Sequence, residues 1–171
     1  MAMSYDDDLS RAILASLHSD KSRAVQAAEI AKRIRSAGPY RWAGLYDVDM
    51  EAGLVSNIAW SGPSGPEFPV FPVTKGLTSR AIATKHTVNV GHVADDPDYL
   101  TALATTQSEI VVPIVRDGRV VGTLDIESET PNAFDSETQG RIERCAFLMT
   151  DLWKKRQKST RRLSDRSPGM P

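Results

Sequence analysis

The order of its predicted elements places this chain in the α+β class. Two segments with helical spacing come first, β-rich segments separated by turn signals follow, and a long helical segment closes the pattern. Strands joined by tight turns pair antiparallel, so this order predicts an antiparallel sheet with the helices packed on one face. The other face of the sheet is then left for a ligand pocket.

The helical segments are identified by apolar residues that recur with the period of a helix. The first runs from Leu9 to Leu17, and the second runs from Ala27 to Ile34, where Gly38-Pro39 ends the pattern. The last begins at a Ser-x-x-Gln capping box, Ser136 to Gln139. Its apolar stripe is expected to be buried and comprises Ile142, Cys145, Ala146, Met149, Leu152 and Trp153.

Runs of β-branched and aromatic residues predict the strands. In the first run, Trp42, Gly44 and Tyr46 share one face, because side chains alternate along a strand. Pro69 and Pro72 confine their own segment to an edge or irregular strand. The expected strands are 42–48, 54–60, 68–73, 87–90, 110–115 and 120–126.

A polar excursion interrupts the strands between Gly91 and Gln107. It is expected to carry a helical turn or two around Tyr99 to Ala104. Long excursions within compact domains are usually functional, so this segment is expected to contribute to function. A short helix is expected from Gly76 to Ala83, with Thr78 or Ser79 as its N-cap.

The composition predicts a single cytoplasmic domain. The chain has 171 residues, 40% of them hydrophobic, which is enough apolar surface for one core. Its N-terminus does not resemble a secretory signal, and no apolar run approaches the roughly 20 residues needed to cross a membrane. We expect residues 1–20 to form a helical extension, 21–158 to form the domain, and 159–171 to form a basic, disordered tail.

The sequence indicates no metal, cofactor or nucleic-acid site. A single cysteine, Cys145, excludes an intramolecular disulfide and a multi-thiolate metal site. No pair among His18, His86 and His92 has the spacing of a zinc site, and no glycine-rich phosphate loop occurs. The formal net charge is −1, and the basic segment 154–162 contains no interleaved aromatic residue. We therefore interpret that segment as a solvated helix end rather than a nucleic-acid interface.

Acidic residues on two strands of one predicted hairpin are the most informative feature of the sequence. Glu109 lies on the first strand, Asp125 and Glu127 lie on the second, and Asp117-Gly118 marks the turn. A strict two-residue turn points Glu109 away from the other two acids, whereas a three-residue loop gathers all three on one face. Gathered acids repel one another, so one is pushed toward protonation unless a cation lies among them. On solvated strands the same acids would be ordinary surface residues.

Several motifs in the stretch 37–149 occur in an order that points to one family. They are Trp42-Ala43-Gly44-Leu45-Tyr46, Ser108-Glu109-Ile110-Val111-Val112-Pro113, Gly122-Thr123-Leu124-Asp125-Ile126-Glu127 and Phe134-Asp135. Together they resemble the GAF domain, and within that superfamily the free methionine-(R)-sulfoxide reductases. This resemblance implies a substrate pocket that holds its ligand with the three acids, although Glu127 stands where the family more often carries Asp.

The resemblance also implies that Trp42 and Tyr46 line the pocket, although both rings would equally fit the core of the first strand. Trp60 stands at a strand end beside a Gly/Pro-rich loop, which suits either a pocket rim or the core. The candidate ligand-binding residues are therefore Trp42, Tyr46, Trp60, Ser108, Glu109, Asp125 and Glu127.

The reductases need thiolates that this chain lacks. Reduction of a sulfoxide requires a thiolate nucleophile. The resemblance places cysteines of the family at the positions of Thr78 and Ala102 and near Phe68, and none of these residues is a thiol. Cys145 lies on the apolar stripe of the last helix, where a small buried hydrophobe is expected.

Three functions remain compatible with these observations. The preferred one is a non-catalytic GAF-type sensory domain that binds a small amine-bearing or zwitterionic molecule and acts in signalling in trans. The second is a divergent sulfoxide reductase that recruits Cys145 or an external thiol. The third is an interaction module with a vestigial pocket, which a solvent-facing Glu109 would favour.

A homodimer built on helices from the two chain ends is expected. The final helix carries Phe147 and Leu148 beyond its main apolar stripe, and the first helix carries apolar residues that include Ile13. An isologous interface would bury both helices. Replacing Ile13 or Leu152 by Glu is expected to disrupt it.

Overall fold

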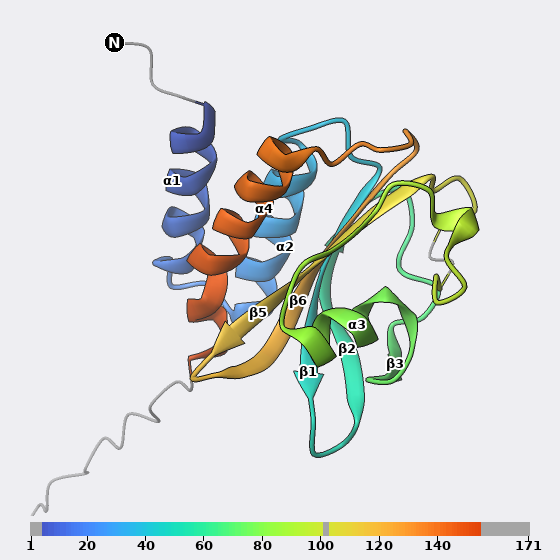
Figure 1. Ribbon diagram of the computed structural model, residues 1–171. Helices are drawn as coiled ribbons and strands as arrows, with labels where there is room; N and C mark the ends of the chain where they lie inside the picture. Colours follow the sequence, from blue (N-terminus) through green and yellow to red (C-terminus); the bar gives the residue numbers. More distant parts are fainter. Residues whose placement is uncertain (1–4, 101–102, 155–171) are drawn as a thin grey trace, which may run out of the picture.

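The computed structural model describes residues 5–100 and 103–154 and confirms the α+β class (Figure 1). The predicted tail at 159–171 lies outside the described residues. Within them, every helix is too short or too polar to pass through a lipid bilayer. The elements are α1 Tyr5–Leu17, α2 Arg23–Arg35, β1 Trp42–Asp49, β2 Leu54–Ser61, β3 Val70–Pro72, α3 Gly76–Thr84, β4 Val88–Val90, η1 Val93–Asp95, β5 Ser108–Arg116, β6 Arg119–Ser128, α4 Ser136–Leu148 and η2 Met149–Trp153.

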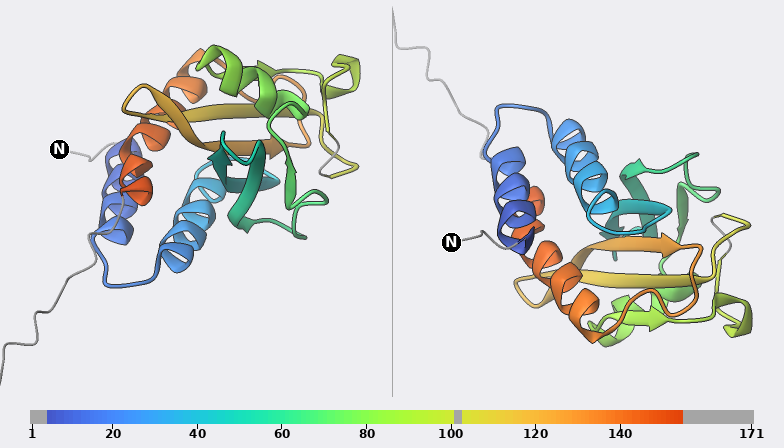
Figure 2. Two further views of the ribbon diagram at one scale, coloured as in Figure 1. Left: turned by 90° about the horizontal axis from the view of Figure 1, so that it is seen from below. Right: turned by 90° about the horizontal axis from the view of Figure 1, so that it is seen from above.

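The described strands form one antiparallel sheet in the order β3-β2-β1-β6-β5-β4. Helices α1, α2 and α4 lie together on one side of the sheet, and α3 lies on the other side (Figure 2). The segment with Pro69 and Pro72 contributes the short edge strand β3, as its prolines predict. The sheet therefore separates a helix-covered face from a face that is covered mainly by loops and α3.

The main core lies between the sheet and helices α1, α2 and α4. Ile30 of α2 and Leu45 of β1 are fully buried there, and so is Ile13 of α1, because α1 packs against α2 and α4. The interface residues expected for the dimer, Ile13 and Leu152, are thus covered by their own chain, and that expectation is wrong in its choice of residues. Phe147 of α4 is instead 79% exposed. The homodimer itself stays a prediction.

Two helix starts differ from the sequence expectation. Helix α4 is capped by Asp135, whose carboxylate accepts a hydrogen bond from the Thr138 N–H at 2.8 Å, rather than by Ser136. A carboxylate at this position also interacts favourably with the positive end of the helix dipole, which a hydroxyl does less strongly. Helix α3 begins after Lys75, which makes no side-chain cap, so Thr78 lies within the first turn.

The helical turn of the polar excursion also lies earlier than expected. The turn η1 spans Val93–Asp95, whereas the described residues between 99 and 104 form no helix. Val93 is buried, and its N–H donates to the carbonyl of Gln107 at 2.9 Å. These contacts fix the turn at the base of the excursion.

The hairpin between β5 and β6 combines features of the two alternatives left open by the sequence. Its turn has two residues, because Arg116 pairs with Arg119, and positive φ angles of 50° and 75° at Asp117 and Gly118 match a type I′ turn. A bulge then shifts the register, so that Val121 has no partner opposite it. The bulge, and not a longer turn, brings Glu109 opposite Glu127.

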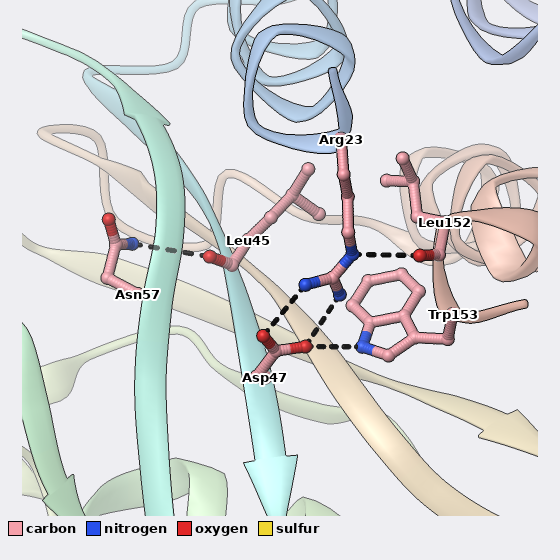
Figure 3. Close-up of polar contacts among 6 residues, drawn as sticks. All are labelled: Arg23, Leu45, Asp47, Asn57, Leu152 and Trp153. Atoms are coloured by element: carbon pink, nitrogen blue, oxygen red, sulfur yellow. Dashed lines mark hydrogen bonds and ion pairs between the residues drawn. The ribbon is translucent and has the colours of Figure 1, made fainter. Parts of the chain in front are cut away.

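A polar clasp joins the helix layer to the sheet near the end of the described chain (Figure 3). The guanidinium of Arg23 donates to both carboxylate oxygens of Asp47, at 2.6 and 2.9 Å, and its Nε donates to the Leu152 carbonyl at 2.8 Å. The Trp153 indole N–H donates to Asp47 at 2.7 Å, and Arg23 lies 5.2 Å from the centre of the indole ring. Residues from α2, β1 and η2 are thereby held together.

We expect Asp47→Ala to lower the free energy of unfolding by about 1–2 kcal/mol, because it removes hydrogen bonds to a charged group. The side chains of Arg23 and Asp47 are 37% and 39% exposed, and this exposure limits the effect through solvent screening. Urea unfolding at pH 7 measures it, with the exposed Glu51→Gln as a control that should stay within about 0.5 kcal/mol of the parent. A midpoint equal to that of the parent would show that the clasp contributes no stability.

Candidate functional site

The three predicted acids lie on one face of the sheet, opposite the helix-covered core. Glu109 of β5 pairs with Glu127 of β6, and Asp125 follows two residues earlier on β6. On the other side of β6, Trp42 of β1 pairs with Glu127 and Gly44 pairs with Asp125. The acids are strongly buried, with exposures of 8% for Glu109, 6% for Asp125 and 2% for Glu127.

The acids line a small cavity of about 40 Å³, within about 420 Å³ of empty space that includes open solvent. The walls come from β1, β3, β5 and β6, from the first turn of α3, and from the segments before β3 and β5. The lining residues are Trp42, Tyr46, Pro66, Phe68, Phe71, Gly76, Leu77, Thr78, Leu100, Glu109, Asp125 and Glu127.

Aromatic rings form one wall of the cavity. The Trp42 ring lies over Gly44, where an added Cβ would stand only 2.0 Å from the ring, so glycine makes room for the indole. The Trp42 N–H donates to the Ser64 carbonyl at 3.2 Å. Tyr46 lies next to Trp42, with ring centres 6.3 Å apart, and forms an edge-to-face pair with Phe71, with ring centres 5.8 Å apart. The predicted shared face of Trp42, Gly44 and Tyr46 is thus the cavity face.

Protein donors satisfy only part of the acceptor capacity of the acids. The Thr106 hydroxyl donates to Oε2 of Glu127, and the Thr78 hydroxyl donates to Oδ2 of Asp125 through a long bond of 3.4 Å. The other Asp125 oxygen, Oδ1, is buried and has no hydrogen-bond partner among the described residues. A buried acceptor without a donor is costly, and this one lies in the wall of a cavity.

Burial raises the pKa of all three carboxyls, and repulsion by neighbouring acids adds to this increase for Asp125 and Glu109. Burial raises the pKa of Asp125 to about 7, although the Thr123 and Thr78 hydroxyls oppose this increase and the Glu127 charge adds to it. Burial likewise raises the pKa of Glu127 to about 7, against the hydrogen bond from Thr106. Burial, together with the charges of Glu127, Asp125 and Asp96, raises the pKa of Glu109 well above its usual range. The pKa of the Tyr46 hydroxyl is also raised, first by burial and then by the same three acids.

The described lining contains no basic side chain that would neutralise these acids. Arg80, on the neighbouring helix α3, is engaged by Asp96 at 2.6 Å and by Asp98 at 3.8 Å. Among the described residues, no group of His, Cys, Asp and Glu is arranged to hold a metal ion. The cavity therefore presents buried acid oxygens beside aromatic rings, which is a chemistry suited to an organic cation.

Two predicted site residues lie outside the cavity lining. Ser108 is buried at the start of β5, where its hydroxyl donates to the Thr130 carbonyl at 2.8 Å and holds the loop before α4. Trp60 pairs with Gly44 but is 39% exposed and lies beside Gly65. Alternation along the strand already places Ser108 on the face opposite Glu109, and this signal could have excluded it.

Other lining residues were not predicted as ligand contacts, because they come from segments without a regular period. Phe71, Leu77 and Leu100 reach the cavity from the edge strand, from α3 and from the polar excursion. Phe68 and Thr78 also line it, and both stand where the resemblance places cysteines of the reductases. The third such position, Ala102, lies outside the described residues.

The only cysteine of the chain does not line the cavity. Cys145 is buried on α4, within the core on the helix-covered face of the sheet. The sheet therefore separates its thiol from the three acids.

Comparisons with known proteins agree with this geometry. A GAF domain model matches residues 23–150. Protein YtsP of Bacillus subtilis is 35% identical over 94 residues, which cover 55% of this chain and 56% of that protein. The free methionine-R-sulfoxide reductase of Saccharomyces cerevisiae is 36% identical over 76 residues, which cover 44% of this chain and 42% of that protein. The chain thus spans only about half the length of these two relatives.

Two solved structures have the same fold and a related sequence. The type II free methionine-R-sulfoxide reductase of Thermoplasma acidophilum is 29% identical, with a TM-score of 0.72 over 76% of this chain and 91% of that chain. The free methionine-R-sulfoxide reductase of Neisseria meningitidis, in complex with its substrate, is 26% identical, with a TM-score of 0.78 over 89% and 92%. The chain therefore belongs to the GAF domain family, with sequence and structural similarity to the free methionine-R-sulfoxide reductases.

Proposed function

We propose that this GAF domain is a non-catalytic sensory module that binds a small organic cation or zwitterion in the acid-lined cavity. The observation that carries the proposal is the burial of Glu109, Asp125 and Glu127 around one cavity whose described lining holds no basic residue. A bound cation would relieve the repulsion among the acids. Its apolar part would lie against the rings of Trp42 and Tyr46.

The similarity to the reductases supports the choice of ligand class. Free methionine-R-sulfoxide, for which those relatives are named, is a zwitterion with an ammonium group, a carboxylate and a short side chain that carries a polar sulfoxide. The reductase chemistry itself gains no support, because Cys145 is buried on the opposite side of the sheet from the acids. The interaction module with a vestigial pocket is also less well supported, because Glu109 is buried and faces a cavity.

We expect a suitable cation to raise the melting temperature by about 5–10 °C at a hundred times its dissociation constant, because such saturation adds about 2.7 kcal/mol to the stability. The screen is run at pH 8, where the carboxyls are more fully ionised, with methionine-(R)-sulfoxide, methionine, n-butylamine and n-propylguanidine as probes. Cyclic GMP serves as an anionic probe that should give no shift.

Asp125→Asn should weaken the binding of any active probe at least tenfold, because it removes a charge while keeping the side-chain volume. The exposed Glu51→Gln should leave the binding unchanged. If none of the cationic probes shifts the melting temperature, and native mass spectrometry shows no copurifying small molecule, the cavity is not a cation site and the proposal fails.

A further inference from the structure

We infer that the cavity selects a guanidinium group over a primary ammonium group, an inference that rests on the proposed binding of a cation. Both groups carry one positive charge, but they differ in the number and direction of their N–H donors. An alkylguanidinium presents five donors in one plane, whereas a primary ammonium presents three around a point. The open acceptors and the aromatic wall of the cavity fit the planar group better.

The three acids leave several hydrogen-bond acceptors open to a ligand. Thr106 and Thr78 each occupy one oxygen, on Glu127 and Asp125. Oδ1 of Asp125 is buried without a hydrogen-bond partner among the described residues. Within the same residues the only hydrogen bonds to the three acids are those from Thr106 and Thr78, which leaves the other oxygen of Glu127 and both oxygens of Glu109 open. Four oxygens are therefore open as acceptors, and an alkylguanidinium, with five donors, can reach more of them at once than a primary ammonium, with three.

The three acids are spread both across the two strands and along β6. Glu109 and Glu127 face each other across two strands, whereas Asp125 lies two residues along β6. A strand rises by about 3.4 Å per residue, so the backbone positions of Asp125 and Glu127 are about 7 Å apart. A flat fork with divergent N–H groups can contact carboxylates on both sides of itself at such a separation. An ammonium nitrogen must sit close to every carboxylate that it binds.

Trp42 lies beside the acids on the neighbouring strand β1. Its buried ring lies over Gly44, and the register places these two residues opposite Glu127 and Asp125. The indole N–H is already bonded to the Ser64 carbonyl, so Trp42 offers the cavity no donor. A guanidinium can stack on an indole while its edge donates to neighbouring carboxylates. It is also more weakly hydrated than an ammonium, so it enters a small, largely buried cavity more readily.

The test compares two monocations of similar length, n-propylguanidine and n-butylamine, by isothermal titration calorimetry at pH 8. We expect n-propylguanidine to bind with a dissociation constant at least tenfold lower. Equal or tighter binding of n-butylamine would overturn the inference while leaving the proposed cation site standing. Binding of neither probe, with no shift by the amino acids in the melting-temperature screen, would instead count against the proposed function.

Glu109→Gln tests the role of the paired carboxylates. The substitution keeps the side-chain volume and removes a buried charge, so the fold should be retained, which circular dichroism checks. Both cations lose the attraction of that charge, but only the guanidinium loses part of a two-sided contact, so the ratio of the two dissociation constants should fall toward one. An unchanged ratio would overturn the bridging geometry. The exposed Glu51→Gln is the matched control and should leave both constants unaltered.

Discussion

The free energy of unfolding is expected to fall by on the order of 3 kcal/mol between pH 5 and pH 8 in the absence of a ligand. Asp125 and Glu127 have pKa values of about 7 in the folded protein, well above 3.8 and 4.5. Between these limits the folded state holds more protons than the unfolded state. The stability is therefore fully present below the unfolded pKa values and is lost as the pH rises through the folded ones.

Urea unfolding at pH 5, 6, 7 and 8 measures this slope. Glu29 and Asp135 do not contribute to this pH dependence of stability. Their hydrogen-bonding partners lower their pKa values, so both carboxyls titrate below the range from pH 5 to pH 8. Asp125→Asn should flatten the curve and be more stable than the parent at pH 8, since it removes one buried charge. A parent stability that stayed constant or rose over this range would show that the acids ionise without penalty and are not buried together.

Gly122→Ala is expected to lower the free energy of unfolding by about 3 kcal/mol, through overpacking. An added Cβ would stand 2.2 Å from the Trp153 ring and 2.6 Å from the backbone oxygen of Tyr46. The ring can move away only by breaking the clasp with Asp47, and the backbone oxygen belongs to the paired strand β1. Both routes of relaxation disturb the strand that carries Tyr46 into the cavity.

Gly140→Ala is the matched control for this substitution. Gly140 lies in α4, is exposed, and has nothing within 4 Å of an added Cβ. Alanine there should raise the stability by about 0.5–1 kcal/mol, because it restricts the unfolded chain and favours the helix. Chemical unfolding of both variants decides the matter. Equal effects would mean that the space above Gly122 is not limiting.

Local patterns in the sequence determined the elements and part of the site. The alternation of Trp42, Gly44 and Tyr46 predicted their shared face, and Asp117-Gly118 predicted the tight hairpin turn. These features depend on residues close together in the chain, where side-chain periodicity and turn geometry act directly. The choice of Asp135 over Ser136 as the cap of α4 was missed, because both residue types are good caps and stand side by side.

Tertiary structure decided whether the acids face one another. The sequence allowed a two-residue turn with Glu109 turned away, or a longer loop with all acids together, and the protein has the short turn and a bulge at Val121. The bulge lies at the second of two adjacent valines, Val120 and Val121, and the sequence carries no local mark of it. Val120 packs on the cavity side of the sheet and Val121 contacts the helix-side core. At this point side chains are buried on both faces of the sheet, and only the assembled sheet and helices provide that burial. The two-sided burial accommodates the extra residue and the register that brings the three acids together.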